Sequence, residues 1–250
     1  MIKANNYTTL SKGSVIMNDI IMKRASKIKK KKKLKKIIKL SLLILVLLLL
    51  LSYFVIGLIY NNGNFTITLD KNLYMQNNLI IYDNVDYKVF RSELNAEPVE
   101  YLDNISSRWL PNNLYDHQGG SHNGDNYIAY TFYIENMGQE VSDYWSEVII
   151  DDVIRDIDEA IRIRVYKNDS FVTYAKLGRN GAVERDTVAF EDDTHVGLDH
   201  VENFAPGDII KYTIVIWLEG NDPDCTDNLL GGEIKLHMEF NSEFKENKDK

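Results

Sequence analysis

Cysteine is nearly absent from this chain, which has one such residue, Cys225, among its 250 residues. An internal disulfide is therefore excluded, and any domain must be held together by its hydrophobic core. The region after residue 60 is long enough for this, because a domain of that size buries roughly 70% of the surface of its unfolded chain. The same region also lacks the fingerprints of several common enzyme classes: Gly-x-Ser-x-Gly, the phosphate-binding loop and the dinucleotide-binding glycines.

Acidic residues are scarce in the first 60 positions, which hold 13 Lys/Arg against one Asp. Residues 61–250 reverse this balance, with 16 Lys/Arg against 36 Asp/Glu. The two regions thus carry formal charges of +12 and −20, which add up to the net charge of −8. An acidic body repels phosphate and excludes nucleic acid as a partner, whereas it suits solubility or the binding of cations.

Charge of either sign is missing between Lys39 and Asp70. Within that gap, 16 of the 21 residues at positions 40–60 are Leu, Ile, Val or Phe. At about 1.5 Å per residue, a helix of this length crosses the roughly 30 Å hydrocarbon core of a bilayer. Residues 40–60 are therefore predicted to span a membrane.

The membrane segment is either a cleavable signal peptide or a retained anchor. Its apolar run is longer than the roughly 7–15 residues of a signal peptide, and no good small-x-small cleavage site follows. We therefore favour an uncleaved signal anchor. The lysine cluster at residues 29–39 places the N-terminus in the cytoplasm. The expected order is a basic cytoplasmic tail (1–39, disordered over 1–22), a single-pass anchor in a bacterial cell membrane (40–60), an extracellular domain (61–245) and a disordered tail (246–250).

The body of the chain reads mainly as strands. Segments such as "NFTITLDK" and "AIRIRVYKND" alternate apolar and polar residues, and "IIKYTIVIWLEG" at residues 209–220 is apolar enough for a central strand. Residues 91–124 form no clean element and read as an irregular insertion. Helical spacing of apolar residues predicts one short helix at residues 151–158. The expected fold is mainly β: an antiparallel β-sandwich of jelly-roll or immunoglobulin-like type, preceded by a single transmembrane helix.

Three strings taken together resemble a known group: "GNFTITLDK", "YIAYTFYIENMG" and "FAPGDIIKYTIVIWLEGNDPDCTDNLLGGEIKLHMEF". They are similar to exported Firmicutes proteins loosely related to the TasA/camelysin biofilm-matrix family. The resemblance implies a jelly-roll-like domain outside a Gram-positive-type membrane and specifies no reaction. The chain departs from the group in its long lysine-rich leader and full membrane span, which argues against assembly into free fibres.

The loop "EGNDPDCTDN" contains three aspartates, Asp222, Asp224 and Asp227. Closely spaced loop carboxylates are typical Ca²⁺ ligands, so the three form a calcium hypothesis. The loop lacks the glycine and the final glutamate of an EF-hand, and a solvated turn capped by aspartate side chains is the simpler explanation. No other cofactor is expected.

Two histidine-containing loops are further candidates for a zinc or catalytic site, although neither has a diagnostic spacing. One loop holds Asp116, His117, His122 and Asp125, and the other holds Asp192, Asp193, His195, Asp199 and His200. Surface histidines are the simpler interpretation. Acidic neighbours disfavour the Cys225 thiolate, which argues against a nucleophilic role. Trp109, Trp145 and Trp217 are expected in the core or on a sheet face.

Three function hypotheses follow. The first is a structural or interaction protein of the bacterial surface or matrix, contacting other surface proteins or copies of itself through an edge strand at residues 64–71. The second is a module that binds calcium or a glycan. The third is an envelope hydrolase that uses a His/Asp cluster. We favour the first, a non-enzymatic role, because no motif specifies a reaction.

Overall fold

The computed structural model describes residues 5–60, 65–99 and 101–243, and it divides the chain into two units, residues 1–60 and 61–250. The first unit is a helix, α1 (Asn5–Tyr60). The disordered tail expected for residues 1–22 is therefore wrong from Asn5 onward, since the helix continues through it. The predicted tail at 246–250 lies outside the described residues.

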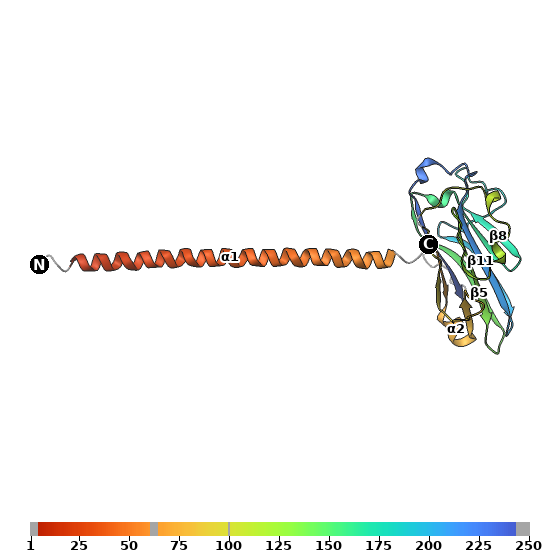
Figure 1. The fold of residues 1–250 in the computed structure, drawn as a ribbon, viewed down its shortest axis with the longest axis horizontal. Coiled ribbons are helices and arrows are strands. Elements are labelled where there is room, and N and C mark those ends of the chain that lie inside the picture. The colour runs from red at the N-terminus through yellow and green to blue at the C-terminus, as the bar shows by residue number, and fades with distance from the viewer. Residues whose placement is uncertain (1–4, 61–64, 100, 244–250) are drawn as a thin grey trace. The chain divides into compact units, whose positions relative to one another are not determined.

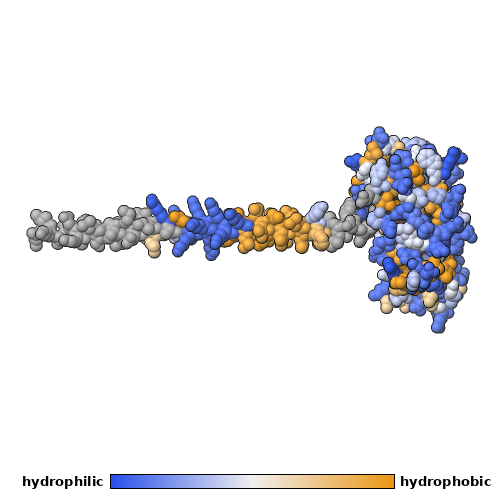
Figure 2. Space-filling model, viewed as in Figure 1, coloured by the Kyte–Doolittle hydropathy of each residue, from blue (hydrophilic) through white to orange (hydrophobic). Residues whose placement is uncertain are grey.

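Helix α1 contains a 34-residue stretch, Met22–Val55, that is long and apolar enough to cross a membrane. Figure 2 shows its lysine segment in blue directly followed by a continuous apolar band in orange. The apolar side chains described there are exposed, as a lipid-facing surface requires. A signal sequence near an N-terminus has the same length and composition, so these features do not separate an anchor from a signal.

The second unit is a β-sandwich of two sheets, as the alternating patterns predicted (Figure 1). One sheet has the order β10-β6-β12-β1-β3, and the other has the order β2-β5-β11-β7-β8-β9, with β4 paired to β5. Most neighbours are antiparallel, and the pairs β1–β12 and β8–β9 are parallel. The strands are β1 (Phe65–Leu69), β2 (Leu79–Tyr82), β3 (Glu93–Asn95), β4 (Gly120–Ser121), β5 (Ile128–Asn136), β6 (Ser142–Ile154), β7 (Ile161–Lys167), β8 (Ser170–Ala175), β9 (Val188–Ala189), β10 (His195–Phe204), β11 (Ile209–Leu218) and β12 (Glu233–Asn241).

The core lies between the two sheets and is filled by the inward residues of the alternating strands. Strand β11 is central, as its apolar sequence predicted, and it pairs with β5 on one side and β7 on the other. At the centre, the hydroxyls of Tyr144 on β6 and Tyr212 on β11 lie 3.1 Å apart and join the sheets. Phe240 on β12 packs edge-on against Tyr212.

The helix expected at residues 151–158 is wrong, because strand β6 continues to Ile154 and pairs with β12. The chain then turns at Arg155 and Asp156, which both have positive φ, into a single 3₁₀ turn, η3 (Ile157–Glu159). A register shift in the β6–β12 ladder falls in this stretch. The bulge changes which residues face inward, so the spacing imitates a helix.

The domain's short helix lies instead at α2 (Lys71–Asn77). The Asp70 carboxylate caps it by accepting a hydrogen bond from the backbone N–H of Asn72, and Asn78 ends it in the left-handed conformation. The edge-strand prediction for residues 64–71 is also wrong. Strand β1 lies inside its sheet, paired with β12 on one side and with β3 on the other.

The irregular insertion at residues 91–124 contacts both sheets: β3 pairs with β1, and the part from Ile105 to Leu114 packs on the outer face of the sheet that contains β11. It contains β3, β4 and two 3₁₀ turns, η1 (Ser107–Trp109) and η2 (Leu114–Asp116). A second, smaller core joins it to that sheet and consists of Ile105, Leu110, Leu114, Ala129, Tyr166, Val215 and Trp217. The insertion is therefore packed against the sandwich and makes one wall of the pocket described next.

Candidate functional site

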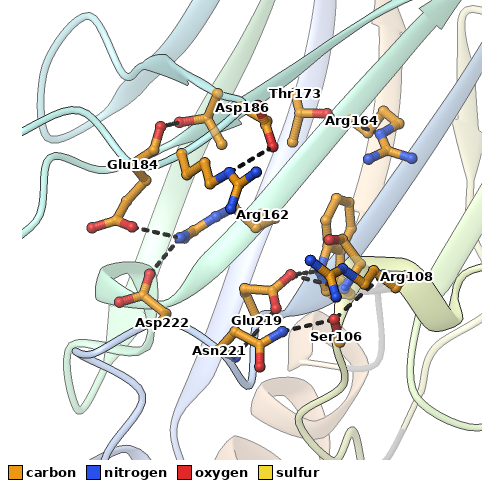
Figure 3. A pocket seen from close by; sticks show the side chains of 14 residues that line it. Ser106, Arg108, Arg162, Arg164, Thr173, Glu184, Asp186, Glu219, Asn221 and Asp222 are labelled. Atoms are coloured by element: carbon orange, nitrogen blue, oxygen red, sulfur yellow. Dashed lines mark hydrogen bonds and ion pairs between the residues drawn. The ribbon is translucent and has the colours of Figure 1, made fainter.

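A pocket of about 390 Å³ opens on the outer face of the β7–β11 sheet, beside this smaller core. Strands β7, β8 and β11 form its floor, η1 forms one wall, and the loop at 184–187 forms another (Figure 3). The chain segment after β11 closes one end. Its lining is polar and consists of Ser106, Ser107, Arg108, Arg162, Arg164, Thr173, Glu184, Arg185, Asp186, Thr187, Trp217, Glu219, Asn221 and Asp222.

The alternation of β7 brings two arginines to the pocket floor. Ile161 and Ile163 point into the sandwich core, so Arg162 and Arg164 face the opposite side of the sheet. The string "IRIRV" indicated this outward pair at the sequence level. It did not indicate that the insertion would cover the same face and turn it into a pocket.

Arg162 is buried and neutralised by acidic residues. Its Nη2 donates to the buried carboxylate of Asp222 and lies 3.5 Å from a carboxylate oxygen of Glu184. Its Nη1 donates to the carbonyl of Ile161 at 3.0 Å. Figure 3 shows the guanidinium between the two acidic side chains. Burial raises the pKa of Glu184, and the neighbouring Asp222 charge raises it further.

Arg164 is held by aromatic rings. Its guanidinium carbon lies 4.6 Å from the ring centroid of Phe171 and 5.1 Å from that of Trp217, which are cation–π distances. The Nε donates to Thr173 Oγ1 at 2.9 Å, and Nη1 lies 3.4 Å from the Tyr166 hydroxyl. These contacts fix the orientation of the cation.

Glu219 is held by three donors at the end of β11. Its Oε2 accepts from the backbone N–H of Ser107 at 2.9 Å and from Trp217 Nε1 at 3.1 Å, and its Oε1 accepts from the backbone N–H of Asn221 at 3.2 Å. These bonds tie the insertion, through η1, to the central strand. Glu219 therefore has a structural anchoring role in the pocket wall.

The structure brings together only two of the three aspartates of the calcium hypothesis. Asp222 and Asp224 lie together, but their third neighbour is Glu184, with ligand atoms of the three within 4.8 Å of one another. Asp227 begins the 3₁₀ turn η4 (Asp227–Leu229) and is exposed. The cluster already has cations: Arg162 pairs with Asp222, and Arg179 Nε lies 3.5 Å from Asp224. Calcium binding at these residues stays a prediction.

The two histidine loops are ordered but do not gather ligands. His117 and His122 stack at 4.1 Å, and His122 Nε2 lies 2.9 Å from Thr131 Oγ1. In the other loop, His195 Nδ1 lies 2.8 Å from Asp192 Oδ1, and His200 stacks on Trp145 at 3.9 Å. Within the part of the chain that the structure describes, neither loop brings three ligand atoms within 4.8 Å of one another.

The remaining candidates are distributed as follows. Burial raises the pKa of the Cys225 thiol, and the charges of Asp222 and Glu219 raise it further. The sequence predicted this direction from the acidic neighbours alone. The structure shows that burial is the larger cause. Trp217 is buried in the smaller core, whereas Trp109 is 76% exposed, contrary to the expected core or sheet-face position.

Comparison with known proteins identifies no family. No family model matches the chain, and no curated protein matches it. Two crystal structures of a β-glucosidase from Kluyveromyces marxianus, one in complex with glucose and one Se-Met labelled, are similar at 13% and 12% identity. They cover 67% and 64% of this chain but 16% of each enzyme chain, with TM-scores of 0.26 and 0.22. A likeness at this level supports no statement about activity.

Proposed function

We propose that this protein is a single-pass membrane protein whose β-sandwich acts outside the cytoplasm as an interaction domain of the bacterial cell surface or matrix. The observation that carries the proposal is helix α1, in which a lysine-rich segment directly precedes an apolar stretch of membrane-spanning length. Basic residues stay on the cytoplasmic side, so the chain after the helix is carried across.

The β-sandwich is compatible with this placement. It has no disulfide and relies on a large two-sheet core, and its acidic surface suits an aqueous compartment. The proposal includes both self-association and contact with other surface proteins. With β1 inside its sheet, strand addition would have to use an end strand, such as β10 or β9.

The placement is tested by labelling single cysteines in intact bacteria with a membrane-impermeant maleimide. Cys225→Ser supplies a cysteine-free chain, into which Ser26→Cys, before the lysine segment and the uncharged run at 40–60, or Ser170→Cys, at the exposed turn between β7 and β8, is introduced. We expect Ser170→Cys to be labelled in intact cells and Ser26→Cys only after permeabilisation. The reverse pattern would overturn the proposal.

The same cells distinguish an anchor from a signal peptide. We expect the full-length chain, with its lysine segment, in the membrane fraction after alkaline washing. Chains beginning near residue 61 and recovered from the medium would instead identify α1 as a cleaved signal, and the matrix-subunit hypothesis would then lead.

A second candidate function is a binding module, because the structure contains a defined polar pocket on one face of the sandwich. The glycan form of this hypothesis is favoured by the pocket. The calcium form rests on the cluster of Glu184, Asp222 and Asp224, which already has Arg162 and Arg179 as cationic partners.

A further inference from the structure

Arginine is concentrated at the pocket. Residues 61–250 contain seven arginines, and four of them line it. The lining also holds four carboxylates, from Glu184, Asp186, Glu219 and Asp222, so its formal charge is balanced in a domain whose formal charge is −20. The pocket arginines differ in how their charge is balanced, and this difference carries the inference.

Two of the four arginines have acidic partners. Arg162 is paired with Asp222 and Glu184, and Arg185 forms an exposed pair with Asp186 at 3.3 Å. Among the described residues, no carboxylate lies within ion-pair distance of Arg164 or of Arg108. One end of the pocket is therefore internally neutral. At the other end Glu219 also lines the pocket, but its carboxylate is hydrogen-bonded to N–H groups and does not form an ion pair with either arginine.

Arg164 is also pre-organised. Its guanidinium lies against the rings of Phe171 and Trp217. Its Nε and Nη1 donate hydrogen bonds to the hydroxyls of Thr173 and Tyr166. Its Nη2 has no acceptor in the described part of the domain. A guanidinium fixed in this way binds an oxyanion with little loss of side-chain entropy.

Two acidic residues of the lining, Glu219 and Asp222, are already held by other donors. Glu219 is held by Ser107, Trp217 and Asn221, and Asp222 accepts from Arg162 and from the backbone N–H of Asp224. An anion that enters the pocket can therefore pair with Arg164 without displacing an existing ion pair.

We propose that this pocket binds a carboxylate or phosphate group of a small ligand, with Arg164 as the main contact and the exposed Arg108 of η1 as the second cation. The volume of about 390 Å³ suits a ligand the size of one sugar unit, whose hydroxyls would meet the polar lining contributed by Ser106, Thr187 and Asn221. An acidic envelope polymer as the source of that group rests on the proposed function, whereas binding of the anion itself does not.

The test is isothermal titration of the full-length chain in neutral detergent with glucuronic acid, glycerol 3-phosphate and glucose. We expect saturable binding of at least one anion and weaker binding of glucose. Saturable binding of glucuronic acid alone would identify a carboxylate site, and saturable binding of glycerol 3-phosphate alone would identify a phosphate site. Binding of both would identify a general oxyanion site. If neither anion binds, or if glucose binds as tightly, the proposal is overturned.

Variants distinguish anion binding in the pocket from anion binding to the lysine segment of α1. We expect Arg164→Gln and Arg108→Gln each to weaken binding, the first by about tenfold, and Arg164→Lys to give an intermediate loss. Arg155→Gln, outside the pocket, is the matched control and should change affinity less than about twofold. Because Arg108 is exposed, its variant tests the site even if Arg164→Gln unfolds.

An equal loss in Arg155→Gln, or no loss in either pocket variant, would contradict the assignment. The measurement uses purified protein and does not depend on membrane orientation. Its failure would leave the proposed placement intact, and failure of the labelling experiment would leave the anion site intact.

Discussion

The Asp222 carboxylate meets the guanidinium of Arg162 at the base of the pocket, and the two side chains are 0% and 5% exposed. They come from β7 and from the loop after β11, 60 positions apart in the chain. A charge so deeply buried is tolerated only when it is paired. This ion pair therefore joins the loop that follows the central strand to the neighbouring strand.

Breaking this buried pair should destabilise the domain strongly. Asp222→Asn leaves Arg162 with only the more distant Glu184, and we expect a loss of about 3 kcal/mol in the free energy of unfolding. Urea unfolding measures it. The control is Asp199→Asn, which removes the exposed partner of Lys167 and should cost less than about 1 kcal/mol. Equal losses would refute the structural role given to Arg162.

Removing Arg162 should create a response to calcium. Arg162→Gln leaves Glu184, Asp222 and Asp224, whose ligand atoms lie within 4.8 Å, without their main cation. We expect millimolar CaCl₂ to raise the melting temperature of this variant and not that of the parent, measured against a chelator. A calcium-dependent shift in the parent that disappears in Asp224→Asn would instead support a native calcium site.

The hydrogen bond between the sheets can be measured with tyrosine variants. Tyr144→Phe and Tyr212→Phe each remove one of two buried hydroxyls that lie 3.1 Å apart. We expect each to cost about 1 kcal/mol, and the double variant to cost much less than the sum, because the second hydroxyl has lost its partner. Tyr133→Phe, whose hydroxyl lies on the surface, is the control. Additive losses would show that the two hydroxyls are not coupled.

The stability of the domain should depend on His122 in mildly acidic solution. Burial, assisted by the nearby His117 and Lys211, lowers the pKa of His122 to about 4. The unfolded chain, with a pKa near about 6.5, binds more protons between these values. Stability is therefore full above pH 6.5 and falls as the pH decreases toward 4.

We expect this contribution to be roughly 1–2 kcal/mol after allowance for solvent screening of the half-buried ring. Urea unfolding of the parent and of His122→Asn at pH 7, 5.5 and 4 measures it. The difference between the two proteins should shrink as the pH falls, and a difference that is constant with pH would contradict the prediction.

The features that the sequence predicted well are those that depend on neighbouring residues. The stretch of α1 that is long and apolar enough to cross a membrane follows from an unbroken apolar run, and the alternation of "IRIRV" predicts both strand β7 and the outward position of Arg162 and Arg164. Alternation and composition are local properties, so no knowledge of the fold was needed to read them.

The errors concern residues whose partners are distant. Helical spacing at 151–158 belongs to a bulged strand paired with β12, and the expected edge strand β1 lies between β12 and β3. Pairing of strands far apart in the chain decides both features.

The acidic loop also shows the difference between a local sequence pattern and the partners that the fold supplies. Three aspartates spaced along a loop suggested calcium, but the fold separates Asp227 from Asp222 and Asp224 and supplies Glu184 and Arg162 in its place. The order of residues was sufficient for the membrane stretch, the strand-rich class and the outward arginines, because each of these is a local property. Only the tertiary structure decided which arginine is neutralised and which one, Arg164, faces the pocket without an acidic partner, because charges from separate strands and loops meet only after the sheet has formed.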